Sequence, residues 1–188
     1  MRSLLQPLLR RWRLSLLRIS GVKIGPPVYI LGGTCIRHVL SRGRRGSLQL
    51  GPRAMISHGV VIETWGGDVK IGHSVFFGPY AVVYGHGGVE IGDESLIAMH
   101  CRIVSSNHAV PPFGRPIQYE PDLLLPTKIG RDVWLGAGVT VLGGVAIGDG
   151  CIVGAGSVVT KSLPPGAIAY GAPAEIRGFR EGSPSRVG

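Results

Sequence analysis

The feature that most constrains this chain is an aliphatic residue that returns at every sixth position. From residue 129 onward the series is unbroken and consists of Ile129, Leu135, Val141, Ile147, Val153 and Val159. Shorter runs of the same period occur earlier, at Leu50, Ile56 and Ile62, at Ile71, Phe77 and Val83, and at Ile91, Ile97 and Ile103. A period of six fits neither an amphipathic helix, which repeats every ~3.6 residues, nor a lone strand, which repeats every ~2.

A six-residue period predicts a coil with flat sides, each of which consumes six residues. Three sides close a triangle in about eighteen residues, as in the hexapeptide β-helices. The aliphatic residue then points inward, and strands of successive coils pair in parallel. Because each coil buries its apolar side chains only against its neighbours, several coils and capped ends are needed. The predicted fold is therefore all-β, a parallel β-helix.

Breaks in the period divide the chain. We expect residues 1–45 to form a basic amphipathic helix and a connector, residues 46–170 the β-helix domain, and residues 171–188 a tail that frays at its end. Within the domain, residues 105–128 hold five prolines and lose the period. A long loop without secondary structure is usually functional. We therefore predict an arm that projects from the coil.

The first twenty residues are basic and rich in leucine. Their apolar residues share one helical face opposite several arginines, and this face consists of Leu5, Leu8, Leu9, Trp12, Leu16 and Ile19. We expect this helix to cap the open end of the β-helix, and peripheral contact with an anionic membrane is the second interpretation. Its apolar runs are too short for a signal peptide or for a membrane span.

Cysteine and charge patterns narrow the functional classes. Cys35, Cys101 and Cys151 form no CxxC pair, so neither a disulfide framework nor a thiolate zinc site is indicated. A reducing, cytoplasmic compartment fits best. If the N-terminal helix contacts a membrane, the protein would lie at the inner membrane face. The formal charge is +9, but the arginine clusters are not interleaved with aromatic residues, which disfavours nucleic acid as a partner.

Two sequence runs carry a family resemblance. The first, from Ile91, reads IGDESLIAMHCRIVSSNH, and the second, from Lys128, reads KIGRDVWLGAGVTVLGGVAIGDGCIVGAGSVVTKSLPPGAIAYGAPA. They resemble the hexapeptide-repeat acyltransferases, above all the enzymes that acetylate sugars and polysaccharide precursors. The resemblance covers about two thirds of the chain and none of the first 45 residues. It implies a left-handed coil, a homotrimer, and active sites between neighbouring β-helices.

The resemblance places the catalytic residue at His108, where the coil opens into the long loop. Acyl transfer from a thioester needs a base for the attacking hydroxyl or amine, and imidazole titrates near neutrality. On sequence chemistry alone, an exposed loop histidine is an equally good interpretation. Two further residues are candidates for binding the acceptor, namely His86 and Asn107. For His86, a solvated turn is an equally good alternative.

The resemblance also implies that acetyl-CoA is the acyl donor. Small residues let the pantetheine arm approach the backbone, and basic residues meet its phosphates; the candidates are Ala137, Ala155, Thr160, Lys161, Arg177 and Arg180. Here the chain departs from the family, because Glu175 stands where a basic residue is common. A second departure concerns the acceptor: an asparagine found in many small-sugar enzymes is missing from residues 78–80.

Five other residues receive structural interpretations. Asp93 and Asp149 are expected to hydrogen-bond their own backbone at corners, and Trp134 is expected to be a packing residue. Cys101 and Cys151 fall in register with inward positions, as small core residues do.

The leading hypothesis is an acetyl-CoA-dependent O-acetyltransferase that acts on a sugar or polysaccharide precursor. An antibiotic, amino-sugar or serine acetyltransferase remains open, and so does a non-catalytic β-helix that serves as an assembly module. A zinc site like that of the β-helix carbonic anhydrases is disfavoured, because no two histidines have the required separation of four residues. No metal is expected.

Overall fold

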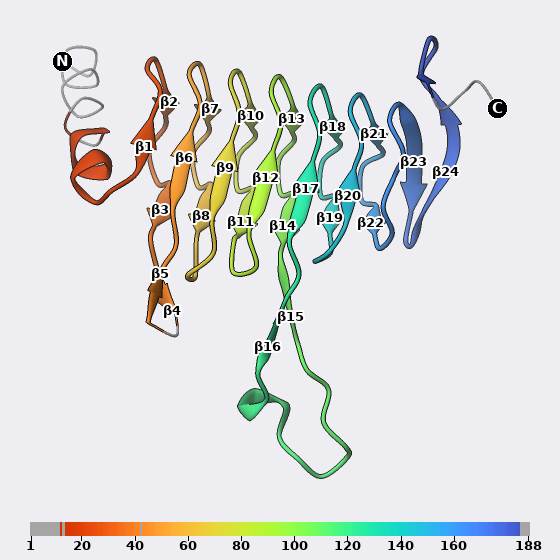
Figure 1. Ribbon diagram of the computed structural model, residues 1–188. Helices are drawn as coiled ribbons and strands as arrows, with labels where there is room; N and C mark the ends of the chain where they lie inside the picture. The colour runs from red at the N-terminus through yellow and green to blue at the C-terminus, as the bar shows by residue number, and fades with distance from the viewer. Residues whose placement is uncertain (1–11, 13, 42, 185–188) are drawn as a thin grey trace.

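The chain folds into a parallel β-helix, which confirms the all-β prediction. The structure is a computed structural model that describes residues 12, 14–41 and 43–184. Short strands repeat in the order sheet A, sheet B, sheet C, and the coils stack along one axis from the N-terminal to the C-terminal end (Figure 1). The six-residue period thus corresponds to one side of a three-sided coil.

Each of the three sheets contains one strand from successive coils. Sheet A consists of β1 (Lys23–Ile24), β6 (Leu48–Leu50), β9 (Val69–Ile71), β12 (Val89–Ile91), β17 (Thr127–Ile129) and β20 (Ala146–Ile147). Sheet B consists of β2 (Tyr29–Ile30), β7 (Met55–Ile56), β10 (Phe76–Phe77), β13 (Leu96–Ile97), β18 (Trp134–Leu135), β21 (Ile152–Val153), β23 (Ala167–Gly171) and β24 (Ala174–Phe179). Sheet C consists of β3 (Cys35–Arg37), β8 (Val61–Glu63), β11 (Val82–Tyr84), β14 (Arg102–Val104), β19 (Thr140–Val141) and β22 (Val158–Val159).

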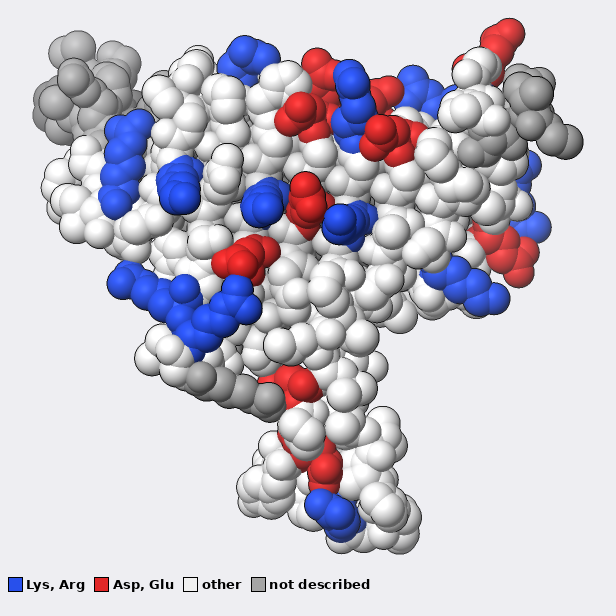
Figure 2. All heavy atoms as spheres, viewed as in Figure 1, with Lys and Arg blue, Asp and Glu red and all other residues white. Residues whose placement is uncertain are grey.

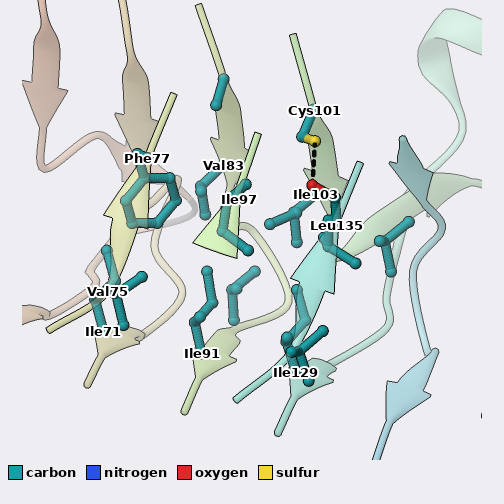
Figure 3. Packing of buried hydrophobic residues seen from close by; sticks show 14 of the residues in the cluster. Ile71, Val75, Phe77, Val83, Ile91, Ile97, Cys101, Ile103, Ile129 and Leu135 are labelled. Carbon is teal, nitrogen blue, oxygen red and sulfur yellow. Dashed lines mark hydrogen bonds between the residues drawn. The ribbon is translucent and has the colours of Figure 1, made fainter. Parts of the chain in front are cut away.

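The core is a column of aliphatic side chains inside the prism (Figure 3). Every periodic residue from Leu50 to Val159 is buried, as the sequence predicts. Phe77 is the largest fully buried side chain and pairs across sheet B with Ile56 and Ile97. Cys101 and Cys151 are buried as predicted, and burial raises the pKa of both thiols.

The corner aspartates differ from the prediction. Oδ1 of Asp93 accepts a hydrogen bond from the backbone N–H of His73 at 2.8 Å, and Oδ1 of Asp149 accepts one from Arg131 at 2.9 Å. Both donors lie in the preceding coil, so these carboxylates join coils instead of closing their own turns. A Cβ atom added at Gly130 would lie 2.3 Å from Oδ1 of Asp149, which explains the glycine there.

The outer faces of sheets A and B differ in chemistry. Sheet A presents charged and polar side chains, and the face shown in Figure 2 carries both blue and red groups. Among them, Lys70, Glu90 and Lys128 are in lateral register. Sheet B presents a continuous apolar ladder, in which each residue pairs with the next: Tyr29, Met55, Phe76, Leu96, Trp134, Ile152 and Ile168. Trp134 belongs to this ladder, between Leu96 and Ile152, and is 51% exposed, so it faces outward from the prism.

The β-helix begins earlier than predicted. Strands β1, β2 and β3 form a first coil that pairs with β6, β7 and β8, within the segment assigned to a helix and connector. The signal was present, because Ile24, Ile30 and Ile36 also repeat every six residues. A two-stranded hairpin, β4 (Leu40–Ser41) and β5 (Arg44–Arg45), then projects from this coil.

The N-terminal helix uses a different face from the one predicted. Residues 12 and 14–19 are helical, and Leu14 and Leu17 pack against the core. The residues of the predicted apolar face that the structure describes are exposed: Trp12, Leu16 and Ile19. Its other members, Leu5, Leu8 and Leu9, lie outside the described residues. In the described part of the chain, no helix has the length and apolar character needed to cross a bilayer.

The C-terminal segment is more ordered than the predicted tail. Strand β24 pairs antiparallel with β23, so that the last strand of sheet B folds back on its neighbour. This pairing reverses the direction of the chain and ends the parallel stacking at this end of the prism.

The predicted arm is present, but it has secondary structure. Strands β15 (Ser106–His108) and β16 (Asp122–Leu124) pair antiparallel, and a 3₁₀ turn, η1 (Ile117–Tyr119), lies beyond them. The arm leaves the prism on the same side as the β4–β5 hairpin (Figure 1).

Candidate active site

Buried hydroxyl groups fix the base of the arm to the prism. The Ser105 hydroxyl donates to the carbonyl of Tyr84 at 2.8 Å and accepts from the N–H of Gly87 at 3.0 Å. The Thr127 hydroxyl donates to the carbonyl of Val104 at 2.7 Å. Both hydroxyl residues are almost fully buried, where an unmade hydrogen bond costs about 1–3 kcal/mol. The arm therefore leaves the coil in a defined direction.

The arm brings a carboxylate to His108. In the antiparallel ribbon His108 stands opposite Asp122, and its Nδ1 lies 3.0 Å from Oδ1 of Asp122. Because a carboxylate only accepts hydrogen bonds, this placement favours the neutral tautomer with the proton on Nδ1, in which Nε2 presents its lone pair. The His108 side chain is 61% exposed, whereas that of Asp122 is 27% exposed. This arrangement leaves Nε2 free to take a proton from an incoming group.

Asp122 is the residue that sequence reasoning missed. It lies fourteen positions beyond His108 in a proline-rich segment, and only the pairing of β15 with β16 brings the two together. No residue that orients His108 was predicted from the sequence. The short apolar run after Asp122, Leu123 to Leu125, is the signal that could have indicated a second strand here.

A second imidazole faces the same carboxylate. Nδ1 of His86 lies 3.7 Å from Oδ2 of Asp122, and Nε2 of His86 lies 3.3 Å from the Ser41 hydroxyl in β4. A solvated turn was one of the two predictions for His86, but the residue is only 8% exposed. The turn after β11 thus places a buried histidine between the β4–β5 hairpin and the arm.

Aromatic and acidic groups extend this polar cluster along sheet C. The Tyr84 ring lies edge-on to His86 at 6.4 Å and tilted against Trp65 at 5.5 Å. Burial first, and then the charges of Glu63 and Asp122, raise the pKa of the Tyr84 phenol. Trp65 donates its indole N–H to Glu63 at 2.9 Å.

Glu63 is also held by Arg37, whose guanidinium forms two hydrogen bonds to its carboxylate.

The described part of the chain contains no group of three or more His, Cys, Asp or Glu side chains placed to hold a metal ion.

Asn107, the other acceptor candidate, is exposed on β15. Its side-chain oxygen accepts a hydrogen bond from the backbone N–H of His108 at 3.0 Å. The amide therefore lies next to His108, while its predicted contact with an acceptor stays a prediction.

The donor candidates lie on three different corners of the prism. Ala137 and Ala155 are exposed and stacked in successive coils between sheets B and C, where the Gly156 N–H donates to the Ala137 carbonyl at 2.8 Å. Thr160 and Lys161 lie on the following corner. There they line a pocket of about 310 Å³ together with residues 173–176.

The two arginine candidates do not meet Lys161. Arg177 forms an ion pair with Glu175 at 2.9 Å and lies over the Tyr170 ring at 5.6 Å. Arg180 pairs with Asp132 at 2.7 Å, on the corner between sheets A and B. A single chain therefore does not assemble the predicted donor site, and each candidate stays a prediction.

Comparison with known proteins shows the family. A model described as bacterial transferase hexapeptide matches residues 126–161, and one described as hexapeptide repeat of succinyl-transferase matches residues 68–100. A putative lipopolysaccharide biosynthesis O-acetyl transferase of Escherichia coli is 33% identical over 70% of this chain and 71% of its own length. Nodulation protein L of Rhizobium meliloti is 38% identical over 72% of both chains. The chain belongs to the hexapeptide-repeat acyltransferases.

Other relatives of this acyltransferase family member are longer. A probable acetyltransferase of Mycobacterium tuberculosis is 30% identical over 90% of this chain, but the matched region covers only 56% of that protein. The galactoside O-acetyltransferase of Escherichia coli is 32% identical over 62% of this chain and likewise 56% of its own length. The chain thus spans about half the length of these curated relatives.

Solved structures show the same fold. AntD, an N-acyltransferase from Bacillus cereus solved with dTDP and coenzyme A, superposes with a TM-score of 0.73 at 23% identity over 90% of both chains. A maltose O-acetyltransferase from Clostridium difficile superposes with a TM-score of 0.54 at 22% identity, over 92% of this chain and 86% of that one. The fold is therefore the left-handed parallel β-helix that the sequence resemblance predicted.

Proposed function

We propose that this protein transfers an acetyl group from acetyl-CoA to a hydroxyl of a sugar or polysaccharide precursor, with His108 as the general base. The observation that carries the proposal is the pair of His108 and Asp122 on the arm, 3.0 Å apart with Nε2 unengaged. The named relatives include O-acetyl transferases of galactosides and of lipopolysaccharide biosynthesis. Their names support a hydroxyl acceptor.

The proposed reaction is a direct attack on the thioester. Nε2 of His108 takes the proton of the acceptor hydroxyl while its oxygen bonds to the carbonyl carbon of acetyl-CoA. The tetrahedral oxyanion then collapses and the C–S bond breaks. Coenzyme A leaves with the sulfur and takes the proton from the imidazolium. Asp122 favours the Nδ1–H tautomer throughout and stabilises the cation that forms.

On the donor side we propose that Thr160 and Lys161 bind acetyl-CoA at the 310 Å³ pocket. Lys161 is exposed and supplies a point charge for a phosphate group. Replacement of Lys161 by alanine is expected to raise the KM for acetyl-CoA about tenfold with kcat little changed, which is the pattern of lost ground-state binding. A kcat loss without a KM change would contradict this role.

We propose that the chain acts as a homotrimer through the apolar ladder of sheet B. A monomer would leave Met55, Leu96 and Trp134 about half exposed in one continuous strip, and such patches mark protein contacts. In the trimer, a neighbouring copy would also bring its donor residues to the arm of this chain. A single chain does not place its own donor candidates together. The Trp134→Glu variant is expected to sediment as a monomer, with Lys128→Glu on sheet A as the control that stays assembled.

Peripheral membrane contact is proposed for the N-terminal helix, whose Trp12 and Ile19 are exposed near the basic Arg18. Such a face suits an anionic lipid surface. Flotation with anionic vesicles should decrease in a Trp12→Ala, Ile19→Ala variant. Unchanged flotation would leave the helix only its packing role at the end of the prism.

The function is tested by release of coenzyme A from acetyl-CoA across a panel of sugars, nucleotide sugars, amino sugars, serine and aminoglycosides. Acceptor-dependent release that falls about 10²–10⁴-fold in His108→Ala supports the proposed base. Equal release in both proteins removes His108 from the mechanism. Release of coenzyme A with amines alone would show that the acceptor group is an amine and not a hydroxyl. Failure to bind acetyl-CoA in calorimetry would favour a non-catalytic β-helix.

A further inference from the structure

Asp122 has two carboxylate oxygens, and each faces a different imidazole. Oδ1 lies 3.0 Å from Nδ1 of His108, and Oδ2 lies 3.7 Å from Nδ1 of His86. The first imidazole is largely exposed and the second is buried. The carboxylate therefore lies between an exposed histidine and a histidine inside the fold.

The environment of His86 does not suit contact with an acceptor. Its ring is 8% exposed, and both of its nitrogens are directed at protein groups, Nδ1 at Asp122 and Nε2 at the Ser41 hydroxyl. With the proton on Nδ1, Nε2 accepts from the hydroxyl, and the Nδ1–H dipole faces a carboxylate oxygen that at 3.7 Å lies beyond direct hydrogen-bond distance. The Tyr84 ring, edge-on at 6.4 Å, further limits rotation of the imidazole.

We infer that His86 is a positioning residue that acts on His108 through Asp122, and that the β4–β5 hairpin holds it in place through Ser41. The inference rests on the proposed function of His108. Without His86, Oδ2 of Asp122 loses the imidazole that faces it at 3.7 Å, and the carboxylate can rotate more freely about its last side-chain bond. The His108 ring would then be held less firmly in one tautomer and one orientation, although Asp122 is still present.

The size of the effect is bounded by the exposure of the site. Asp122 is 27% exposed, so water replaces part of what His86 supplies. Misplacement of a catalytic group by about 1 Å can cost about 10²-fold. A loss of about tenfold in kcat, with the KM for acetyl-CoA unchanged, is therefore the expected result of removing the contact.

Two substitutions separate the two contacts of His86. In His86→Asn, the side-chain amide nitrogen occupies the place of Nδ1 and keeps a donor toward Asp122. In His86→Gln, the amide reaches the place of Nε2, which keeps the Ser41 contact and abandons Asp122. The inference predicts that the glutamine variant shows the kcat loss and that the asparagine variant restores most of the activity. His58→Gln, at an exposed corner, is the control.

A double-mutant cycle tests the route through His108. If His86 acts only through His108, His86→Gln causes no further loss of rate in a His108→Ala background. A loss that adds fully to that of His108→Ala, or equal losses in the asparagine and glutamine variants, would overturn the inference. A rise in acceptor KM that persists in that background would return His86 to the acceptor site.

A measurement that needs no activity keeps this inference distinct from the proposed function. Long-range ¹H–¹⁵N spectra of the histidine rings report which nitrogen carries the proton. The native protein should show His108 with the proton on Nδ1, and His86→Gln should show a mixture of tautomers. An unchanged His108 tautomer in His86→Gln overturns the inference, whether or not the native protein transfers acetyl groups.

Discussion

Replacement of Asp122 by asparagine gives the most direct test of how the arm works. The substitution keeps the size and shape of the side chain but offers both an oxygen and an N–H to His108. When the amide N–H faces Nδ1, that nitrogen must accept, and the ring proton moves to Nε2. The base is then blocked in the orientation that the reaction needs.

The structure limits the size of this effect from above. If Asp122 acts only through His108, removing it cannot lower kcat by more than a general base contributes, which is about 10²–10⁴-fold. In a fully buried serine-protease triad the same change costs about 10⁴-fold. Here His108 is 61% exposed and Asp122 27% exposed, so water competes for both partners. We expect a loss of about 10–10³-fold in kcat.

The assay is steady-state release of coenzyme A with the preferred acceptor. Glu120→Gln is the matched control, because Glu120 is a carboxylate on the same arm that pairs with Arg115 at 2.8 Å. Activity in Asp122→Asn that equals the native level would show that the contact does not matter for catalysis. A loss greater than that of His108→Ala would show that Asp122 has a role beyond orienting the histidine.

Three further predictions concern stability and reactivity. Phe77→Ala should lower the free energy of unfolding by about 3–5 kcal/mol, measured in urea, because a fully buried ring leaves a cavity in the column; a loss below 1 kcal/mol would contradict this packing. Hydrogen bonds from the Ser47 hydroxyl and backbone N–H lower the pKa of Asp68 from 3.8. Their contribution to the stability of the folded protein is therefore complete above the pKa of Asp68 in the unfolded state. It is lost as the pH falls through the pKa of Asp68 in the folded state. Ser47→Ala should therefore lower the melting temperature near neutral pH and have less effect in acid, and an equal effect at both would exclude this linkage. Cys101 and Cys151, whose thiol pKa values burial raises, should resist alkylation until the protein unfolds, and rapid labelling of both in the native state would contradict their inward position.

The interior of the fold was predictable because one physical rule generates it. An inward residue every sixth position places Ile129, Leu135 and Val141 on three successive sides, and each is buried. The outer residues obey no such rule. Trp134 follows an inward valine and looks like a core residue by composition, yet it stands one step out of phase with Leu135 and faces outward. The phase of the repeat therefore decides burial more strongly than residue type.

The boundaries of the β-helix were harder to predict because its end coils carry weaker versions of the repeat. The first coil has Ile24, Ile30 and Ile36 in period, but Pro26, Pro27 and Gly-rich turns obscure it. The last strand, β24, pairs antiparallel and so carries no six-residue period at all. End coils lack a neighbour on one side, and their sequences are therefore less constrained by stacking.

The candidate site combines residues that local patterns cannot relate. His108 could be singled out from the sequence because the resemblance marks its position, but Asp122 depends on the register of β15 with β16, and that register is set by thirteen intervening residues. His86 and Ser41 come from earlier coils and reach the arm only because their turns project from the same side of the prism. The stacking of coils converts a separation of 45 residues into a contact of 3.3 Å. In this fold, the repeat thus builds the frame, and its interruptions, stacked above one another, build the site.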